Sequence, residues 1–73
     1  MLYEIVIRGY IGDTWFEDLT VIRQPNFETM LRGQLMDQSA LYGVLRKIND
    51  LGVELLSVNR IDEVRPVDNE KYQ

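Results

Sequence analysis

The stretch DQSALYGVLRKINDLG, residues 37–52, decides how the rest of the chain can fold. Its apolar side chains recur at helical spacing and form one stripe: Leu41, Val44, Leu45, Ile48 and Leu51. Asp37 stands where an N-cap carboxylate can accept from free amides of the first turn, and Gly52 stands where a left-handed residue ends a helix. The stretch therefore predicts one amphipathic helix over 38–51.

The segments around this helix have the period of two that is typical of strands. Three such segments precede the helix and one follows it: 2–11, 19–23, 29–35 and 53–61. Gln24-Pro25-Asn26 is a turn signal, because proline fixes φ and asparagine tolerates the left-handed region. The order strand-strand-strand-helix-strand predicts an α+β fold, a four-stranded mixed sheet with the helix packed on one face.

The connections restrict the topology of this sheet. A meander of the first three strands makes the first and third parallel, and a right-handed crossover through the helix makes the fourth parallel to the third. The fourth strand can lie beside either the first or the third. We expect a single α+β domain over residues 1–61 and a flexible polar tail over 62–73, where no apolar period occurs.

The length of 73 residues predicts one domain with a modest core. Domains of this size usually need a disulfide, a metal or an oligomeric contact for stability. The chain contains neither cysteine nor histidine, which excludes disulfides and removes the preferred ligands of zinc. We therefore expect no cofactor and no metal, and we expect a homo-oligomer, with a dimer favoured. An unidentified protein is the alternative partner.

The charge and hydropathy of the chain argue against two classes of partner. Eight basic residues are scattered among twelve acidic ones, for a net charge of −4, whereas nucleic-acid binding needs clustered Lys and Arg. No apolar stretch approaches the eighteen or so residues that span a bilayer. The N-terminal residues lack the pattern of a signal peptide. We expect neither nucleic acid nor a membrane as a partner, and a cytoplasmic location.

The chain offers little for catalysis. Histidine and cysteine, the commonest general base and nucleophile, are absent. Ser39 lies in the first helical turn, where serine is common for capping reasons. The adjacent acidic pairs Glu17-Asp18 and Asp62-Glu63 are interpreted as solvated. We expect no catalytic residue and no enzymatic activity.

Two glycines and one tryptophan stand out. Gly33, inside the third strand, indicates a bulge or a close backbone approach. Gly43 costs about 1 kcal/mol relative to alanine in mid-helix, and we interpret it as close packing of helix on sheet, in preference to a contact with a partner or ligand. Trp15 is placed in the core, in preference to an interface.

One helix covers only one face of a four-stranded sheet, so the sequence predicts a second apolar surface. The candidate self-association face consists of Val6, Ile22, Met30 and Leu55. Polar residues surround it: Glu4, Arg8, Thr20, Arg32, Gln34 and Ser57. An apolar centre with a polar rim of mixed charge is typical of a protein interface.

The chain resembles a family of small, uncharacterised prokaryotic proteins. The residues that carry the likeness follow the signature D-Q-x-A-L-x-G-x-L-x-K-I-x-D-L-G-x-x-L-L-S-V, which begins at Asp37, and an opening segment that includes Trp15-Phe16. The likeness covers most of residues 3–58. It implies no activity and no functional residues.

A weaker likeness, over half a domain, is to ACT-type regulatory domains, which bind amino acids at dimer interfaces. It implies a ligand-binding turn formed by Met36, Asp37, Ser39, Ala40 and Gly43. The sequence departs from that pattern, since Ser39-Ala40 stands where the turn has glycine and the second helix is missing.

Two hypotheses result. The leading one is a non-enzymatic protein-interaction module that self-associates through the open sheet face. The alternative is a small-ligand-sensing regulatory domain that binds near the strand-to-helix turn. A deep pocket beside the helix N-terminus favours the sensor, and a flat apolar sheet face favours the module.

Overall fold

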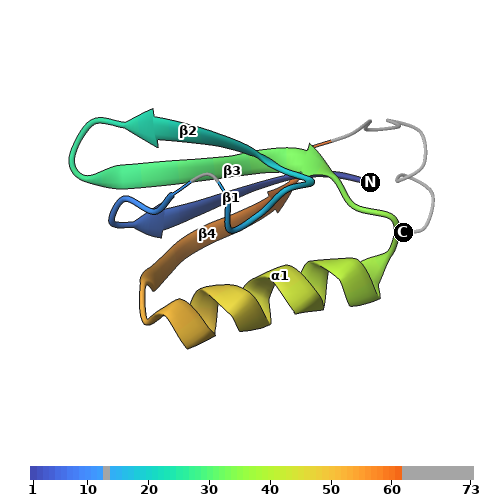
Figure 1. Ribbon diagram of the computed structural model, residues 1–73. Helices are drawn as coiled ribbons and strands as arrows, with labels where there is room; N and C mark the ends of the chain where they lie inside the picture. The colour runs from blue at the N-terminus through green and yellow to red at the C-terminus, as the bar shows by residue number, and fades with distance from the viewer. Residues whose placement is uncertain (13, 62–73) are drawn as a thin grey trace, which may run out of the picture.

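A computed structural model describes residues 1–12 and 14–61, and the expected tail at 62–73 lies outside these residues. The elements follow one another as β1 (Leu2–Arg8), β2 (Thr20–Gln24), β3 (Glu28–Gln34), α1 (Gln38–Leu51) and β4 (Glu54–Arg60) (Figure 1). The predicted α+β class and element order are confirmed. The first strand is shorter than expected, because the chain turns at Gly9, whose φ is 118°.

The strands stand in the order β2-β3-β1-β4, and every neighbouring pair is antiparallel. The expected mixed pairing is therefore wrong, and so is the meander: β1 pairs with β3 and is antiparallel to it. The β1–β2 connection carries the chain past β3 to the far edge, and β2 and β3 form the expected hairpin. β4 lies beside β1. β3 and β4 share a direction, as the crossover predicted, because both are antiparallel to β1.

The caps of α1 agree with the sequence. The Asp37 carboxylate accepts a hydrogen bond from the Ala40 amide, with the Oδ1–N distance at 2.9 Å. Gly52 adopts a left-handed φ of 77°. Leu41 and Ile48 of the predicted stripe are buried, and the other three stripe residues pack against the core.

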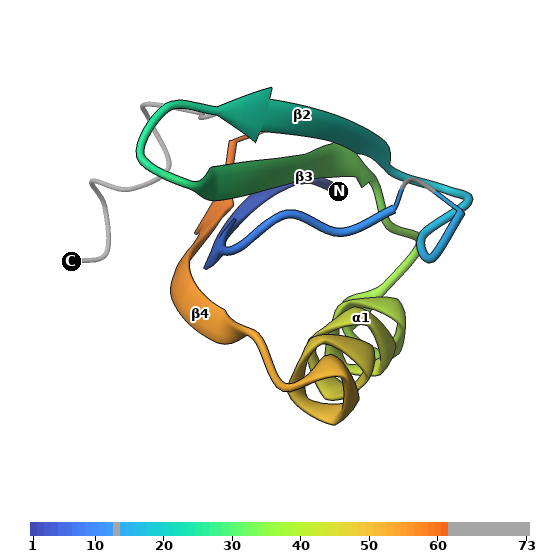
Figure 2. The same cartoon turned by 60° about the vertical axis from the view of Figure 1, so that its left-hand side comes forward.

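The core lies between the sheet and two covering segments, α1 and the described residues of the β1–β2 connection, 9–12 and 14–19 (Figure 2). The connection contributes Phe16 and Leu19 to the buried set, which also contains Tyr3, Ile5, Ile7, Leu31, Leu35, Leu41 and Ile48. The Lys47 ammonium ties this connection to α1 by donating to the Trp15 carbonyl oxygen, 3.0 Å away. Trp15 itself is 48% exposed, so its expected place in the core is wrong. Its neighbour Phe16 takes the inward position in the turn.

The two glycines differ in what they contact. A Cβ added at Gly33 would lie 2.8 Å from Leu19 Cδ2 and 2.9 Å from the Asp18 carbonyl oxygen, so a close backbone approach is confirmed there. A Cβ added at Gly43 would meet nothing within 4 Å, so close packing of helix on sheet does not explain this residue. The irregularity in the sheet lies instead on β4, at Leu56.

We expect alanine to have opposite effects at these glycines. Gly43→Ala should raise the free energy of unfolding by about 1 kcal/mol, because alanine favours the helix and open space receives its methyl group. Gly33→Ala should lower it by about 1 kcal/mol or more, because backbone atoms occupy the space. Urea denaturation of both variants and the parent measures this. Equal shifts in one direction would contradict the assignment.

Candidate functional site

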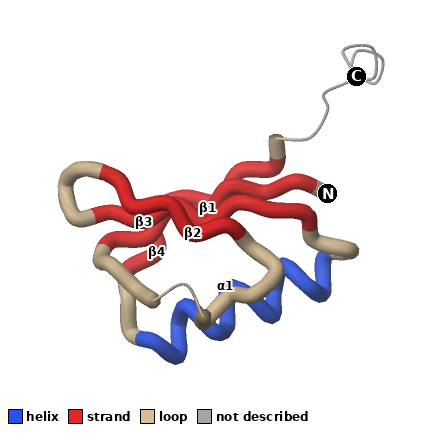
Figure 3. The backbone as a smooth tube through the Cα atoms, turned by 45° about the horizontal axis from the view of Figure 1, so that its top comes forward, coloured by secondary structure: helices blue, strands red, loops and turns tan. Residues whose placement is uncertain are grey.

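The side of the sheet turned away from α1 carries no described element (Figure 3). Its centre is a row of side chains that crosses all four strands. Ile22 pairs with Met30, Met30 pairs with Val6, and Val6 pairs with Ser57. Ile22 is 37% exposed, and the other three are half-buried. We call these residues the apolar row, with Ser57 at its β4 end.

Leu55, the fourth residue of the candidate face, lies elsewhere. The register between β1 and β4 shifts between Val6 and Ile7, so Ser57 stands opposite Val6 and Leu55 stands opposite Ile7. Leu56 is the extra residue of this bulge, which reverses the alternation of faces that the sequence suggested. Leu55 is 44% exposed at the sheet edge, outside the apolar row.

Two further rows flank the apolar row on the same face, one on each side. The first charged row consists of Thr20, Arg32, Glu4 and Asn59, and the second charged row consists of Gln24, Glu28, Arg8 and Glu54. In the first row, Arg32 Nη1 lies 3.5 Å from Glu4 Oε2. In the second row, Arg8 Nε lies 3.0 Å from Glu54 Oε1. Each row thus carries charges of both signs.

Sequence reasoning placed Arg8, Arg32 and Glu4 on the rim of this face but missed Glu28 and Glu54. Glu28 was outside the expected third strand, which began at residue 29. The signal was present, since Glu28 alternates with Met30 and Arg32 at the spacing that keeps side chains on one face.

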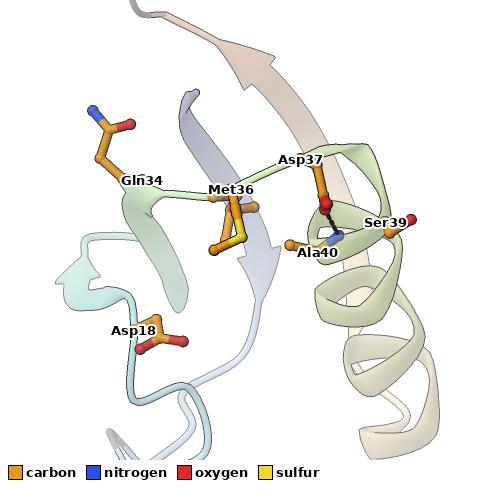
Figure 4. Close-up of a pocket in the computed structure, with 7 residues that line it drawn as sticks. Asp18, Gln34, Met36, Asp37, Ser39 and Ala40 are labelled. Carbon is orange, nitrogen blue, oxygen red and sulfur yellow. Dashed lines mark hydrogen bonds between the residues drawn. The ribbon is translucent and has the colours of Figure 1, made fainter.

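A hollow of about 720 Å³ lies at the strand-to-helix turn (Figure 4). It is lined by Asp18, Gln34, Leu35, Met36, Asp37, Ser39 and Ala40. Four of the five residues of the candidate ligand turn therefore come together. Gly43 is not among the lining residues, and its exposed position on α1 places it apart from them.

The polar groups of this hollow are exposed and partly engaged. Asp37 accepts from the Ala40 amide, and Gln34 Oε1 accepts from the Met1 amino group at 3.0 Å. The side chains of Asp18 and Ser39 are exposed as well. A small molecule held here would stay in contact with water, so its hydrogen bonds would exchange for those of solvent with little gain.

The described part of the chain contains neither a metal-binding cluster nor a membrane-spanning helix. Residues 1–12 and 14–61 contain no group of three or more acidic side chains that could hold a metal ion. Within the same residues, no helix has the length and apolar character needed to cross a membrane.

Comparison with known proteins gives one match. A family model described as Domain of unknown function (DUF8691) matches residues 2–59, which include all of β1 through α1 and most of β4. No match was found among curated proteins or among solved structures. An uncharacterised family is thereby confirmed; the specific signature beginning at Asp37, the ACT likeness and the prokaryotic origin stay predictions.

Proposed function

The chain belongs to the family described as Domain of unknown function (DUF8691), and on this premise we propose a function from its surface. The domain is a non-enzymatic module that joins two copies of itself through the open face of the sheet. The absence of cysteine fits a reducing compartment, and we place the module in the cytoplasm.

The apolar row carries this proposal. Ile22, Met30 and Val6 form a continuous apolar strip on three neighbouring strands, and a charged row stands on each side of it. An apolar centre with a hydrogen-bonding and charged rim is the usual anatomy of a protein interface. Covering the strip would give the sheet a second apolar layer, as in sheets that pack face to face about 10 Å apart.

The size of the domain supports the same function. Within residues 1–12 and 14–61, one helix covers one side of the four-stranded sheet, and no described element covers the other side. Small domains usually obtain part of their stability from a staple. The chain has no cysteine and cannot form disulfides, so contact with a second copy is the additional stabilising interaction that it can supply itself.

The turn hollow supports the ligand-sensing alternative less well. Its lining brings together four of the predicted residues, but every polar side chain in it is exposed. Small-molecule sites usually bury most of the ligand surface and fix it with a few precisely placed polar groups. The open sheet face needs no such enclosure, because a protein partner itself excludes water.

We expect Ile22→Glu to convert a dimer into monomers. The contact between two copies is isologous, so one substitution places a carboxylate at the β2 end of the apolar row in both subunits. Sedimentation of parent and variant at matched concentration measures the change. Tyr42→Glu is the control, because Tyr42 is also an exposed large apolar residue but lies on α1, away from the sheet face.

Two results would contradict the proposal. A parent that is monomeric at high micromolar concentration removes self-association. A parent that dimerises, with Ile22→Glu dimerising equally well, assigns the contact to another surface.

A further inference from the structure

The order of residues within the three rows restricts how a second copy can sit on the open face. This inference rests on the proposed function and concerns its geometry. When two identical faces meet, the two-fold axis lies in the plane between them. For aligned sheets this axis runs either along the strands or across them. The two directions bring different residues together.

With the axis across the strands, along the apolar row, each strand lies over its own copy. Ile22, Met30 and Val6 then each meet the same residue of the second copy, and Ser57 meets Ser57. Apolar atoms are thus covered by apolar atoms along the whole strip, and the hydroxyl groups meet each other at its end. No apolar side chain of the row faces a polar one.

The same rotation places the first charged row over the second charged row. Arg32 then faces Glu28 of the second copy, and Glu4 faces Arg8 of the second copy. Symmetry repeats both contacts, so four pairs of opposite charge surround the strip. Complementary charges of this kind fix the register of an interface and disfavour other arrangements.

Other axes match the face less well. An axis along the strands, between β3 and β1, also joins opposite charges, but it places Ile22 over Ser57 of the second copy. An axis along β3 places Arg32 over Arg32 and Glu28 over Glu28, and like charges would repel. Charge repulsion therefore excludes the axis along β3. The apolar row then favours the axis across the strands over the axis between β3 and β1, because only the former covers Ile22 with an apolar side chain.

We infer that this protein forms a face-to-face dimer whose two-fold axis runs along the apolar row, with Arg32 of each copy against Glu28 of the other. The partner of the open face is therefore a second copy of this chain. Glu28 and Arg32 lie four residues apart on β3, too far to pair with each other within one copy, where Arg32 pairs with Glu4.

An exchange of these two charges tests the axis. Arg32→Glu alone sets carboxylates against each other twice in the dimer, and Glu28→Arg alone does the same with guanidinium groups. Each should raise the dimer Kd by about tenfold or more. The combined variant Glu28→Arg/Arg32→Glu restores opposite charges across the axis, and its Kd should return to within a few-fold of the parent.

A mixture of the single variants gives a second measurement, which does not need the combined variant to fold. Glu28→Arg and Arg32→Glu mixed in equal amounts should form a heterodimer, because every pair across the axis is then of opposite sign. Native mass spectrometry identifies it. With the axis along the strands, position 28 meets Arg8 and position 32 meets Glu4, so neither the mixture nor the combined variant would recover.

The outcomes separate this inference from the proposed function. A monomeric parent contradicts both the proposed self-association and the inferred axis. A second outcome is a dimeric parent that Ile22→Glu dissociates, while neither the combined variant nor the mixture restores association. This result supports self-association through the open face and contradicts the axis along the apolar row. Recovery in either experiment supports the axis across the strands.

Discussion

Replacing Leu31 by alanine is expected to lower the free energy of unfolding by about 2–5 kcal/mol. Leu31 has 0% of its surface exposed and stands in β3 with a strand on each side, where it pairs with Ile5 and Val21. Its truncation removes buried apolar atoms and leaves a cavity that the two flanking strands cannot close. A domain of this size has about 4–11 kcal/mol of stability in total, so the variant loses much of it.

Leu55→Ala is the matched control for this experiment. It removes the same atoms from a leucine that is 44% exposed at the sheet edge, so we expect a loss of less than about 1 kcal/mol. Urea denaturation followed by circular dichroism compares the two variants with the parent. Equal losses in Leu31→Ala and Leu55→Ala would show that the core is not centred on β3.

The parts of the fold that depend on neighbouring residues could be predicted from the sequence. The helix has its caps at Asp37 and Gly52 because capping is a contact within a few residues. The β2–β3 hairpin follows from the turn at Pro25-Asn26, where Asn26 has the positive φ that asparagine tolerates. Both features depend on short, contiguous sequence patterns.

The order of the strands could not be predicted, because it depends on contacts far apart in the chain. β1 pairs with β3 since the connection 9–19 crosses the sheet to bury Phe16 and Leu19. A short meander would have left these two side chains outside the core. The sequence showed both as apolar residues of a loop, but not which strands they would cover.

The candidate face was predicted in part for a related reason. Val6, Ile22 and Met30 alternate regularly within their strands, so the period of two places them correctly. Leu55 was misplaced because the bulge at Leu56 shifts the alternation of β4 by one residue. Adjacent leucines give no sign of such a shift, since either can face the core.

The hydrogen bond of Thr29 stabilises the point where the chain leaves β1. Thr29 is fully buried, and its hydroxyl donates to the Gly9 carbonyl oxygen at 2.6 Å. The Gly9 amide donates to the Phe27 carbonyl oxygen at 2.7 Å. These two bonds hold the first residue of the long connection against the β2–β3 hairpin, and so support the pairing of β1 with β3.

Thr29→Val is therefore expected to lower the free energy of unfolding by about 1–3 kcal/mol, because valine keeps the shape but leaves the buried carbonyl oxygen without this donor. Thr29→Ser keeps the hydroxyl and loses one methyl group, which costs about 1 kcal/mol. The order of the two variants in urea denaturation is the decisive measurement. If the valine variant is as stable as the parent and the serine variant is not, packing of the methyl group matters at this site and the hydrogen bond does not. If valine is the less stable, the bond to Gly9 holds the start of the connection that determines the strand order.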